Sequence, residues 1–553
     1  MGHSQHLPGA DSQTLNEAHA ALEQGAWLEA RHGFEAALAE VETPEALEGL
    51  ATAAWWLEEP ETVFPSREQA YRLFRQRSDD RAAGRLATEL GFDYAVFRAE
   101  LAVANGWLQR AHRLLDDLDP VPEQAWLALR EAELTYHIEG DLDRVRELAG
   151  QANALAARLG MLDPEMLGLA LEGLALVGLG EVGDGMPRLD EAIAAAVAGE
   201  LHSFQAISTT FCLMVFACER TRDVDRAGQW CERFMDYCQR YDLKGYLAFC
   251  RGHYASVLTA RGHWAEAEEQ LLLALDGLQH RLAWALSPLE RLGELRRRQG
   301  RLDEAEETFE QALLYPPSIL GKARVALDRG DLQSALDLVE RALRRMSERN
   351  RTERVPCLEL LVRIHCAHGE VGEAEKTLRE LEDVAHVVQT DCLLALAIHA
   401  RGQLALATDD SSGAKAPLED ALDLYERVQL PFEAALVRLD LGRALYAVGR
   451  DDSALDLIRT AHDTFRGLGA AAEVARARGL IDQLAGPAGP TILSPRETEV
   501  LKLLSRGLSN QEIADELFVS RHTIRRHVSS ILTKLDVPSR TAAVASALEH
   551  NLI

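Results

Sequence analysis

The sequence predicts an all-α protein, a long helical solenoid followed by a compact four-helix domain. Helix-favouring residues dominate the 553-residue chain, in which 47% of residues are apolar and 27% are charged. A turn-and-helix pattern recurs about every forty residues, and helix-capping signals gather in the last 63 residues. We therefore expect a flexible N-terminus (1–13), helical repeats (14–484), a Gly/Pro linker (485–490) and a C-terminal domain (491–553).

Each repeated unit begins with a turn residue, usually Gly, followed five residues later by a small residue, usually Ala, and then by an apolar helical stripe. In the segment 254–275, Gly262 permits the turn, Ala267 lets the second helix approach the first, and Leu271 points into their shared core. Each unit is therefore predicted to be a pair of antiparallel helices. The twelve turn positions, spaced by 30 to 42 residues, are Gly25, Pro65, Gly106, Gly140, Gly180, Arg222, Gly262, Gly300, Gly330, Gly369, Asp409 and Gly449.

These units resemble tetratricopeptide repeats whose period is stretched from about 34 residues towards 40. The segments "GRLDEAEETFEQAL" (300–313) and "GDLQSALDLVERAL" (330–343) match that pattern best. The resemblance implies a curved superhelix whose concave face binds peptides, partner proteins or small ligands. The repeats stop at "AGPAGP" (485–490), where two Gly-Pro steps interrupt any helix.

One stretch of the solenoid, residues 202–264, is enriched in aromatic residues and contains five of the eight cysteines. The rings either pack the helices together or line a small-molecule pocket. The thiols are expected to be buried and free in a reducing cytoplasm, with a redox sensor as the alternative. The candidate pocket residues are Phe211, Met214, Trp230, Phe234, Tyr237, Tyr241, Tyr246, Phe249, His253 and Tyr254.

Charge is distributed unevenly along the chain. The net charge is −29, and the segment 491–553 holds eight basic and seven acidic residues, so the first 490 residues carry −30. Such an acidic region repels nucleic acid and membranes, which confines any polyanion contact to the C-terminal domain. There is no membrane-length apolar run, zinc-ligand spacing, phosphate-binding loop or nucleophile motif. We expect a cytoplasmic protein that is not an enzyme, needs no metal or cofactor and does not bind a membrane.

The last 63 residues predict four short helices. "SPRE" (494–497) and "SNQE" (509–512) are capping boxes that start the first two, Ser520 caps the third, and "PSR" (538–540) introduces the fourth. Arg525 and Arg526 lie on one face of the third helix, away from its apolar stripe. A short helix, a tight turn and a longer helix with a basic face are typical of a helix-turn-helix. The apolar stripe comprises Ile524, Val528, Ile531, Leu532 and Leu535.

The segment "LSPRETEVLKLLSRGLSNQEIADELFVSRHTIRRHVSSILTKLDVPSRTAAV" resembles the DNA-binding domain of LuxR-type transcriptional regulators over its full length. The resemblance implies that the third helix enters the major groove and that the domain dimerises through its fourth helix on a palindromic operator. Arg526 is a departure, because this position is more often small or apolar in such domains. The matching residues include Leu493, Ser494, Arg496, Glu497, Gly507, Ser509, Asn510, Glu512, Ile513, Ala514, Ser520, Thr523, His527, Lys534, Leu535 and Arg540.

Carried over by position, the resemblance implies base contacts from Arg525, Arg526 and Ser529. It implies phosphate contacts from Ser509, Asn510, Thr523, His527, Lys534 and Arg540. We therefore expect a homodimeric transcription regulator that binds double-stranded DNA, contacts RNA polymerase if it is an activator, and senses an unknown small molecule, peptide or protein through its repeats. The alternative is an interaction scaffold whose helix-turn-helix docks onto protein.

Overall fold

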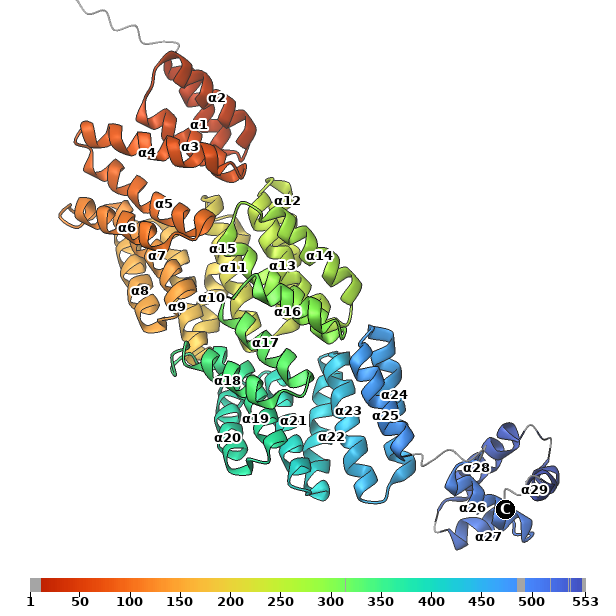
Figure 1. The fold of residues 1–553 in the computed structure, drawn as a ribbon. Helices are drawn as coiled ribbons and strands as arrows, with labels where there is room; N and C mark the ends of the chain where they lie inside the picture. Colours follow the sequence, from red (N-terminus) through yellow and green to blue (C-terminus); the bar gives the residue numbers. More distant parts are fainter. Residues whose placement is uncertain are drawn as a thin grey trace, which may run out of the picture. The chain divides into compact units, whose positions relative to one another are not determined.

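The computed structural model describes residues 11–313, 315–484, 493–517, 519–535, 537 and 539–549. The expected linker and most of the expected flexible N-terminus lie outside these residues. The chain divides into two compact units, Met1–Arg478 and Gly479–Ile553, which are described separately. Throughout these ranges the regular structure is helical, without a strand, so the all-α prediction is confirmed (Figure 1).

The first unit is a row of antiparallel helix pairs (Figure 1). Its first half consists of α1 (Asp11–Glu23) with α2 (Trp27–Glu40), α3 (Pro44–Trp56) with α4 (Pro60–Gln76), α5 (Asp80–Arg98) with α6 (Leu101–Leu115), α7 (Pro122–Leu134) with α8 (Leu142–Leu159), α9 (Leu162–Leu179) with α10 (Val182–Ala198), and α11 (Phe204–Thr221) with α12 (Val224–Arg240). A π-helical turn, η1 (Thr135–Glu139), extends α7.

The second half continues in the same way. It consists of α13 (Lys244–Arg261) with α14 (Trp264–Gly277), α15 (Leu282–Arg298) with α16 (Leu302–Glu310), α17 (Pro316–Asp328) with α18 (Leu332–Leu343), α19 (Arg351–His368) with α20 (Val371–Val388), α21 (Asp391–Ala407) with α22 (Ser411–Arg427), and α23 (Pro431–Ala447) with α24 (Asp451–Leu468). α25 (Ala471–Leu484) follows the last pair.

Ten of the twelve predicted turns lie between the helices of a pair, whereas the turns at Pro65 and Gly106 were wrong. Pro65 lies inside α4 and Gly106 inside α6. The chain turns earlier in both pairs, at Glu58 and Ala99, which adopt left-handed φ values of 65° and 53°. Non-glycine residues rarely adopt this conformation, so no local signal marked either turn.

The small residue that follows each turn allows close helix packing. Ala267, Ala305 and Ala335 are all completely buried. The same pairs bury Leu271 and Phe309 completely, so the second helix of each pair places a larger apolar residue one turn after the alanine. Burial of this stripe stabilises each pair through the hydrophobic effect and dense packing.

The solenoid coils back on itself, so that successive windings touch. Side chains donate hydrogen bonds to backbone carbonyl oxygens about 170 to 210 residues away. These bonds run from Trp27 Nε1 to Tyr241 (2.8 Å), from Asn350 Nδ2 to Gly140 (3.0 Å), from Thr390 Oγ1 to Thr221 (2.5 Å) and from Arg261 Nη1 to Val428 (2.6 Å). They satisfy carbonyls that the preceding helix leaves unpaired.

The second unit comprises α26 (Pro495–Ser505), α27 (Asn510–Glu516), α28 (Arg521–Lys534) and α29 (Arg540–Glu549). Both predicted capping boxes are present, Ser494 with Glu497 and Ser509 with Glu512, and Ser520 Oγ accepts a hydrogen bond from the Thr523 N–H (3.1 Å). The helices surround their own apolar core, made of Leu493, Val500, Leu501, Leu503, Leu504, Ile513, Ala514, Ile524, Ile531, Ala543 and Ala547. This unit therefore has the core of an independent domain.

Candidate nucleic-acid interface

The exposed face of α28 is the basic surface of the second unit. Ile524 and Ile531 are completely buried, which turns Arg525, Arg526 and Ser529 towards solvent. Neither arginine has an ion-pair or hydrogen-bond partner within the described ranges. Their guanidinium groups are therefore available to a ligand outside the domain, and a guanidinium fork matches the guanine edge in the major groove.

Arg521 belongs to the same face but was missed by sequence reasoning. It is the first residue of α28, is exposed, and precedes Arg525 by four residues, the spacing of neighbours on a helix surface. It also forms no ion pair with any residue that the structure describes. The signal was present in the sequence as an i, i+4 arginine pair.

The expected phosphate-contacting residues of the short helix lie at its start. Ser509 is exposed and caps α27, donating its N–H to Glu512 Oε2 (2.7 Å) and accepting the Glu512 N–H with its Oγ (3.3 Å). Asn510 is half-buried at the first helical position. Thr523 Oγ1 lies 2.8 Å from Ser520 Oγ, and His527 is half-buried on α28. The start of each helix thus presents hydroxyls and backbone N–H groups, which suit phosphate oxygens.

Lys534 and Arg540, the other two expected phosphate contacts, have partners inside the domain. Lys534 Nζ lies 2.6 Å from Glu497 Oε2, and Arg540 Nη2 donates to the Leu508 carbonyl oxygen at 2.6 Å. The first bond joins the end of α28 to the start of α26, and the second joins α29 to the loop before α27. Sequence reasoning had given Glu497 only a capping role.

Glu497 is a buried junction between two helices. Its carboxylate accepts hydrogen bonds from the Ser494 N–H (2.7 Å), Ser530 Oγ (2.7 Å) and Lys534 Nζ (2.6 Å). Burial alone would raise the pKa of Glu497, but the hydrogen bonds from Lys534, Ser530 and the Ser494 backbone together lower it below its ordinary value. The carboxylate therefore stays charged at neutral pH.

The predicted aromatic pocket lies in the main core of the solenoid. Phe211, Met214, Phe234, Tyr246 and His253 are buried, and Phe211 stacks on Phe234 with centroids 5.0 Å apart and planes 7° from parallel. The remaining five, which are partly buried against this core, are Trp230, Tyr237, Tyr241, Phe249 and Tyr254. The rings pack α11, α12 and α13 together, and their use as a ligand site stays a prediction.

The cysteines of this region are free and buried, from Cys212 to Cys250. Burial raises the pKa of Cys212, Cys218 and Cys238 well above the ordinary value, so these thiols stay protonated. A protonated, inaccessible thiol is a poor nucleophile. The environment therefore favours the structural interpretation over the redox sensor.

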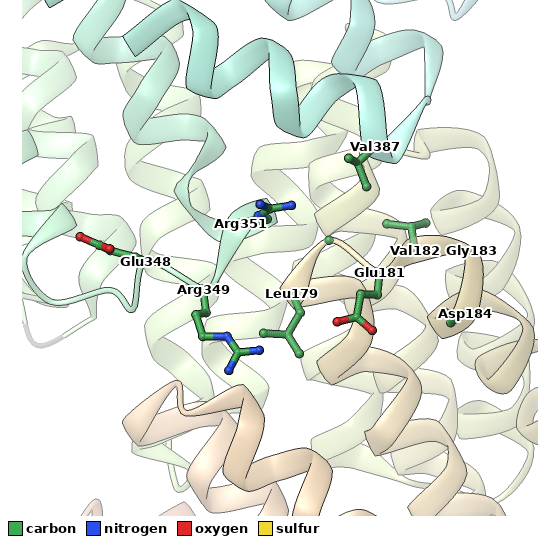
Figure 2. A pocket seen from close by; sticks show the side chains of 10 residues that line it. Leu179, Glu181, Val182, Gly183, Asp184, Glu348, Arg349, Arg351 and Val387 are labelled. Carbon is green, nitrogen blue, oxygen red and sulfur yellow. The ribbon is translucent and has the colours of Figure 1, made fainter. Parts of the chain in front are cut away.

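A surface cleft of about 600 Å³ lies elsewhere in the solenoid (Figure 2). It is formed by the α9–α10 turn, the segment between α18 and α19, and the end of α20. The lining residues are Leu179, Gly180, Glu181, Val182, Gly183, Asp184, Glu348, Arg349, Arg351 and Val387. None of these belongs to the predicted aromatic pocket, and no sequence signal marked the cleft because it joins segments that lie far apart in the chain.

Fold and basic face together define a helix-turn-helix domain joined in one chain to a helical-repeat region. Residues 491–547 match the family model "Bacterial regulatory proteins, luxR family", and residues 212–485 match "MalT-like TPR region". The C-terminal domain is therefore a LuxR-family helix-turn-helix domain, and the second part of the solenoid is a MalT-like tetratricopeptide region.

Two curated relatives match a short segment of the chain. Each is 50% identical to this chain over 62 residues. They are the response regulator protein VraR of Staphylococcus aureus (strain Mu3 / ATCC 700698) and the response regulator protein VraR of Staphylococcus epidermidis (strain ATCC 35984 / DSM 28319 / BCRC 17069 / CCUG 31568 / BM 3577 / RP62A). That segment is 11% of this chain and 30% of each relative, so the chain spans less than a third of their length.

Two solved structures match this chain at low similarity. The APC/C hetero-tetramer Cut9-Hcn1 has a TM-score of 0.44 and 15% identity, covering 98% of this chain and 96% of that one. A Rap protein complexed with competence and sporulation factor has a TM-score of 0.46 and 15% identity, covering 63% of this chain and 99% of that one.

The helices of the described residues include none with the length and apolar composition of a membrane span. In the same residues, no three His, Cys, Asp or Glu side chains are grouped to hold a metal ion.

Proposed function

We propose that this protein is a cytoplasmic, sequence-specific DNA-binding transcription regulator that acts as a homodimer, with its repeat region sensing an effector. The observation that carries the proposal is the exposed basic face of α28, where Arg525 and Arg526 have no protein partner in the described ranges. In the solenoid, by contrast, arginines are commonly paired; Arg297, for example, contacts both Glu294 (2.8 Å) and Asp328 (2.6 Å). Unpaired arginines in a chain whose first 490 residues carry a charge of −30 favour a polyanionic ligand.

On DNA, Arg525, Arg526 and Ser529 would face base edges, and Arg521 would extend this surface by one helical turn. Ser509, Asn510, Thr523 and His527 would hold phosphates and fix the register of α28 in the groove. Dimerisation would use α29, on which Leu548 is 60% exposed. A two-fold dimer matches a palindromic operator, and RNA polymerase would be the partner of an activator.

The test begins with selection of genomic DNA fragments by the full-length protein, followed by footprinting on the selected operator. Replacing both Arg525 and Arg526 with Ala should weaken specific binding at least about 30-fold, because each bidentate arginine–guanine pair contributes about 1 to 3 kcal/mol. The matched control is Arg344→Ala with Arg345→Ala, an adjacent exposed pair that changes the net charge equally. Footprinting at wild-type affinity by the Arg525/Arg526 variant would refute this role.

The same selection separates the regulator from the scaffold alternative. A scaffold whose helix-turn-helix docks onto protein would enrich no DNA sequence, and any DNA binding that it showed would lack a steep salt dependence. A regulator should lose affinity steeply as salt rises, since each neutralised phosphate releases condensed counterions.

We also propose that the acidic solenoid competes with DNA for the basic face when effector is absent. The charge of −30 over the first 490 residues supports this, and the second unit has its own apolar core. Deleting residues 1–484 should therefore raise DNA affinity at low salt. Equal affinities of the deleted and complete chains would rule the idea out.

The effector has two candidate locations in the solenoid, the predicted aromatic pocket and the cleft of Figure 2. Cell extract added to the DNA selection should reveal whether an effector changes affinity. Val387 is 47% exposed and lines the cleft, so Val387→Glu would block it with little effect on folding. Phe249→Ala alters the aromatic cluster instead. The variant that loses the response to extract identifies the location.

A further inference from the structure

The cation of Lys534, whose side chain is 42% exposed, is already paired with a buried carboxylate of its own domain. Its Nζ lies 2.6 Å from Glu497 Oε2, and the Glu497 side chain is only 5% exposed. Ser530, one helical turn before Lys534, donates to the other oxygen of the same carboxylate at 2.7 Å. Two residues of one face of α28 are thus tied to one buried acid of α26.

This junction fixes the orientation of α28. Glu497 is itself held in place by the capping box, because its carboxylate accepts the Ser494 N–H and its own N–H bonds to Ser494 Oγ at 3.2 Å. A buried carboxylate with three donors has little freedom to move. The C-terminal half of α28 therefore cannot rotate about its axis without breaking two of these bonds, and any rotation would turn Arg521, Arg525 and Arg526 away from their positions.

We propose that Lys534 is a positioning residue and not a phosphate ligand: Glu497, Ser530 and Lys534 form a clamp that sets the angle at which α28 presents its arginines to DNA. This inference rests on the proposed function. Moving Lys534 Nζ to a phosphate would leave the buried Glu497 carboxylate without its cation, and such an uncompensated buried charge is costly. The ion pair therefore favours retention of the clamp in the DNA complex.

The salt dependence of DNA binding distinguishes the two roles. A lysine that neutralises a phosphate contributes about 0.9 to the slope of log affinity against log salt, whereas a lysine paired inside the protein contributes nothing. The experiment measures operator binding by the full-length wild-type protein, Lys534→Met, Glu497→Gln and the double variant, between 50 and 200 mM salt, about the range over which phosphate contacts are resolved.

Under the clamp model, Lys534→Met and Glu497→Gln should each lower specific affinity about tenfold or more, the loss expected for a misplaced base contact. The slope of log affinity against log salt should not fall for either variant. The double variant should bind DNA no more weakly than the weaker-binding of the two single variants, because both substitutions break the same bond. A slope reduced by about 0.9 in Lys534→Met, with unchanged affinity in Glu497→Gln, would overturn the proposal.

Ser530→Ala provides a milder variant if either change at the ion pair prevents folding, which circular dichroism would reveal. It leaves the charge of Lys534 intact and removes only the hydroxyl bond to Glu497. The clamp model expects weaker specific binding with an unchanged salt slope, and wild-type affinity would count against it. Failure of the proposed function would appear separately, as the absence of any selected operator for the wild-type protein.

Discussion

Arg281 joins two windings of the solenoid, and its removal should destabilise the first unit strongly. The side chain is 1% exposed at the start of α15, and its Nε lies 2.7 Å from Glu58 Oε2, 223 residues earlier in the chain. Its Nη2 donates to the Trp55 carbonyl oxygen at 3.2 Å, and the guanidinium stacks 3.9 Å from the Trp55 ring and 4.5 Å from that of Trp284.

Arg281→Met keeps much of the apolar stem but leaves Glu58, whose side chain is 11% exposed, as an unpaired enclosed charge. We expect a loss of about 3 to 5 kcal/mol in the free energy of unfolding, the cost of removing one partner from a buried pair. Adding Glu58→Gln should recover a large part of that loss, because the second change removes the uncompensated charge.

The assay is urea denaturation of the full chain followed by tryptophan fluorescence, in which Trp55 and Trp284 report directly on this junction. The matched control is Arg349→Met, which breaks a pair of similar length (2.6 Å to Asp143) whose arginine side chain is 63% exposed. An exposed pair contributes only about 0 to 1 kcal/mol. The reasoning is refuted if Arg281→Met costs no more than the control, or if the double variant is no more stable than Arg281→Met alone.

Three further predictions concern local stability. The hydrogen bond to Glu131 raises the pKa of His112 to about 9 despite burial. The stabilisation that protonated His112 gives the folded state is therefore complete below the ordinary histidine pKa of about 6.5 and is lost as pH rises through 9. The urea midpoint should fall less between pH 6 and 9.5 in His112→Gln than in wild type, and an equal fall would contradict the assignment. Gly106→Ala should stabilise α6 by about 0.5 to 1 kcal/mol, since nothing lies within 4 Å of its added methyl group. Gly293→Ala should instead destabilise by about 1 to 3 kcal/mol, because that methyl would lie 2.6 Å from the buried Phe309 ring. Thermal unfolding of both variants checks the opposite signs.

The candidate site was predictable where its signals are local. The capping serines of α26, α27 and α28 and their bonded partners lie three residues apart, so sequence spacing alone identified three helix starts. The exposed face of α28 followed from the apolar period of the same helix. The partner of Lys534 was not predictable in this way, because Glu497 lies 37 residues earlier and meets it only after α26 packs on α28.

The turns of the repeats likewise divide into those that a local sequence signal marks and those that only packing reveals. Glycine turns are visible in the sequence because glycine adopts left-handed φ readily, as Gly140 and Gly262 do at 65° and 86°. The turn at Ala99 has no such mark, and packing of α5 against α6 holds this alanine at φ 53°. Packing between these two helices thus outweighed the local preference of glycine for turns, which had led to the prediction of a turn at Gly106.

The sequence by itself determined the helical class, the period of the solenoid, the helix caps and the basic face of α28, because each depends on residues within a few positions of one another. Only the tertiary structure decided which windings touch, that Arg281 is buried against Glu58, that the aromatic cluster is packed into the core, and that Lys534 is bound inside its own domain. These features depend on how helices far apart in the chain pack, and the energy that selects their partners comes from burial and from pairing of the enclosed charges.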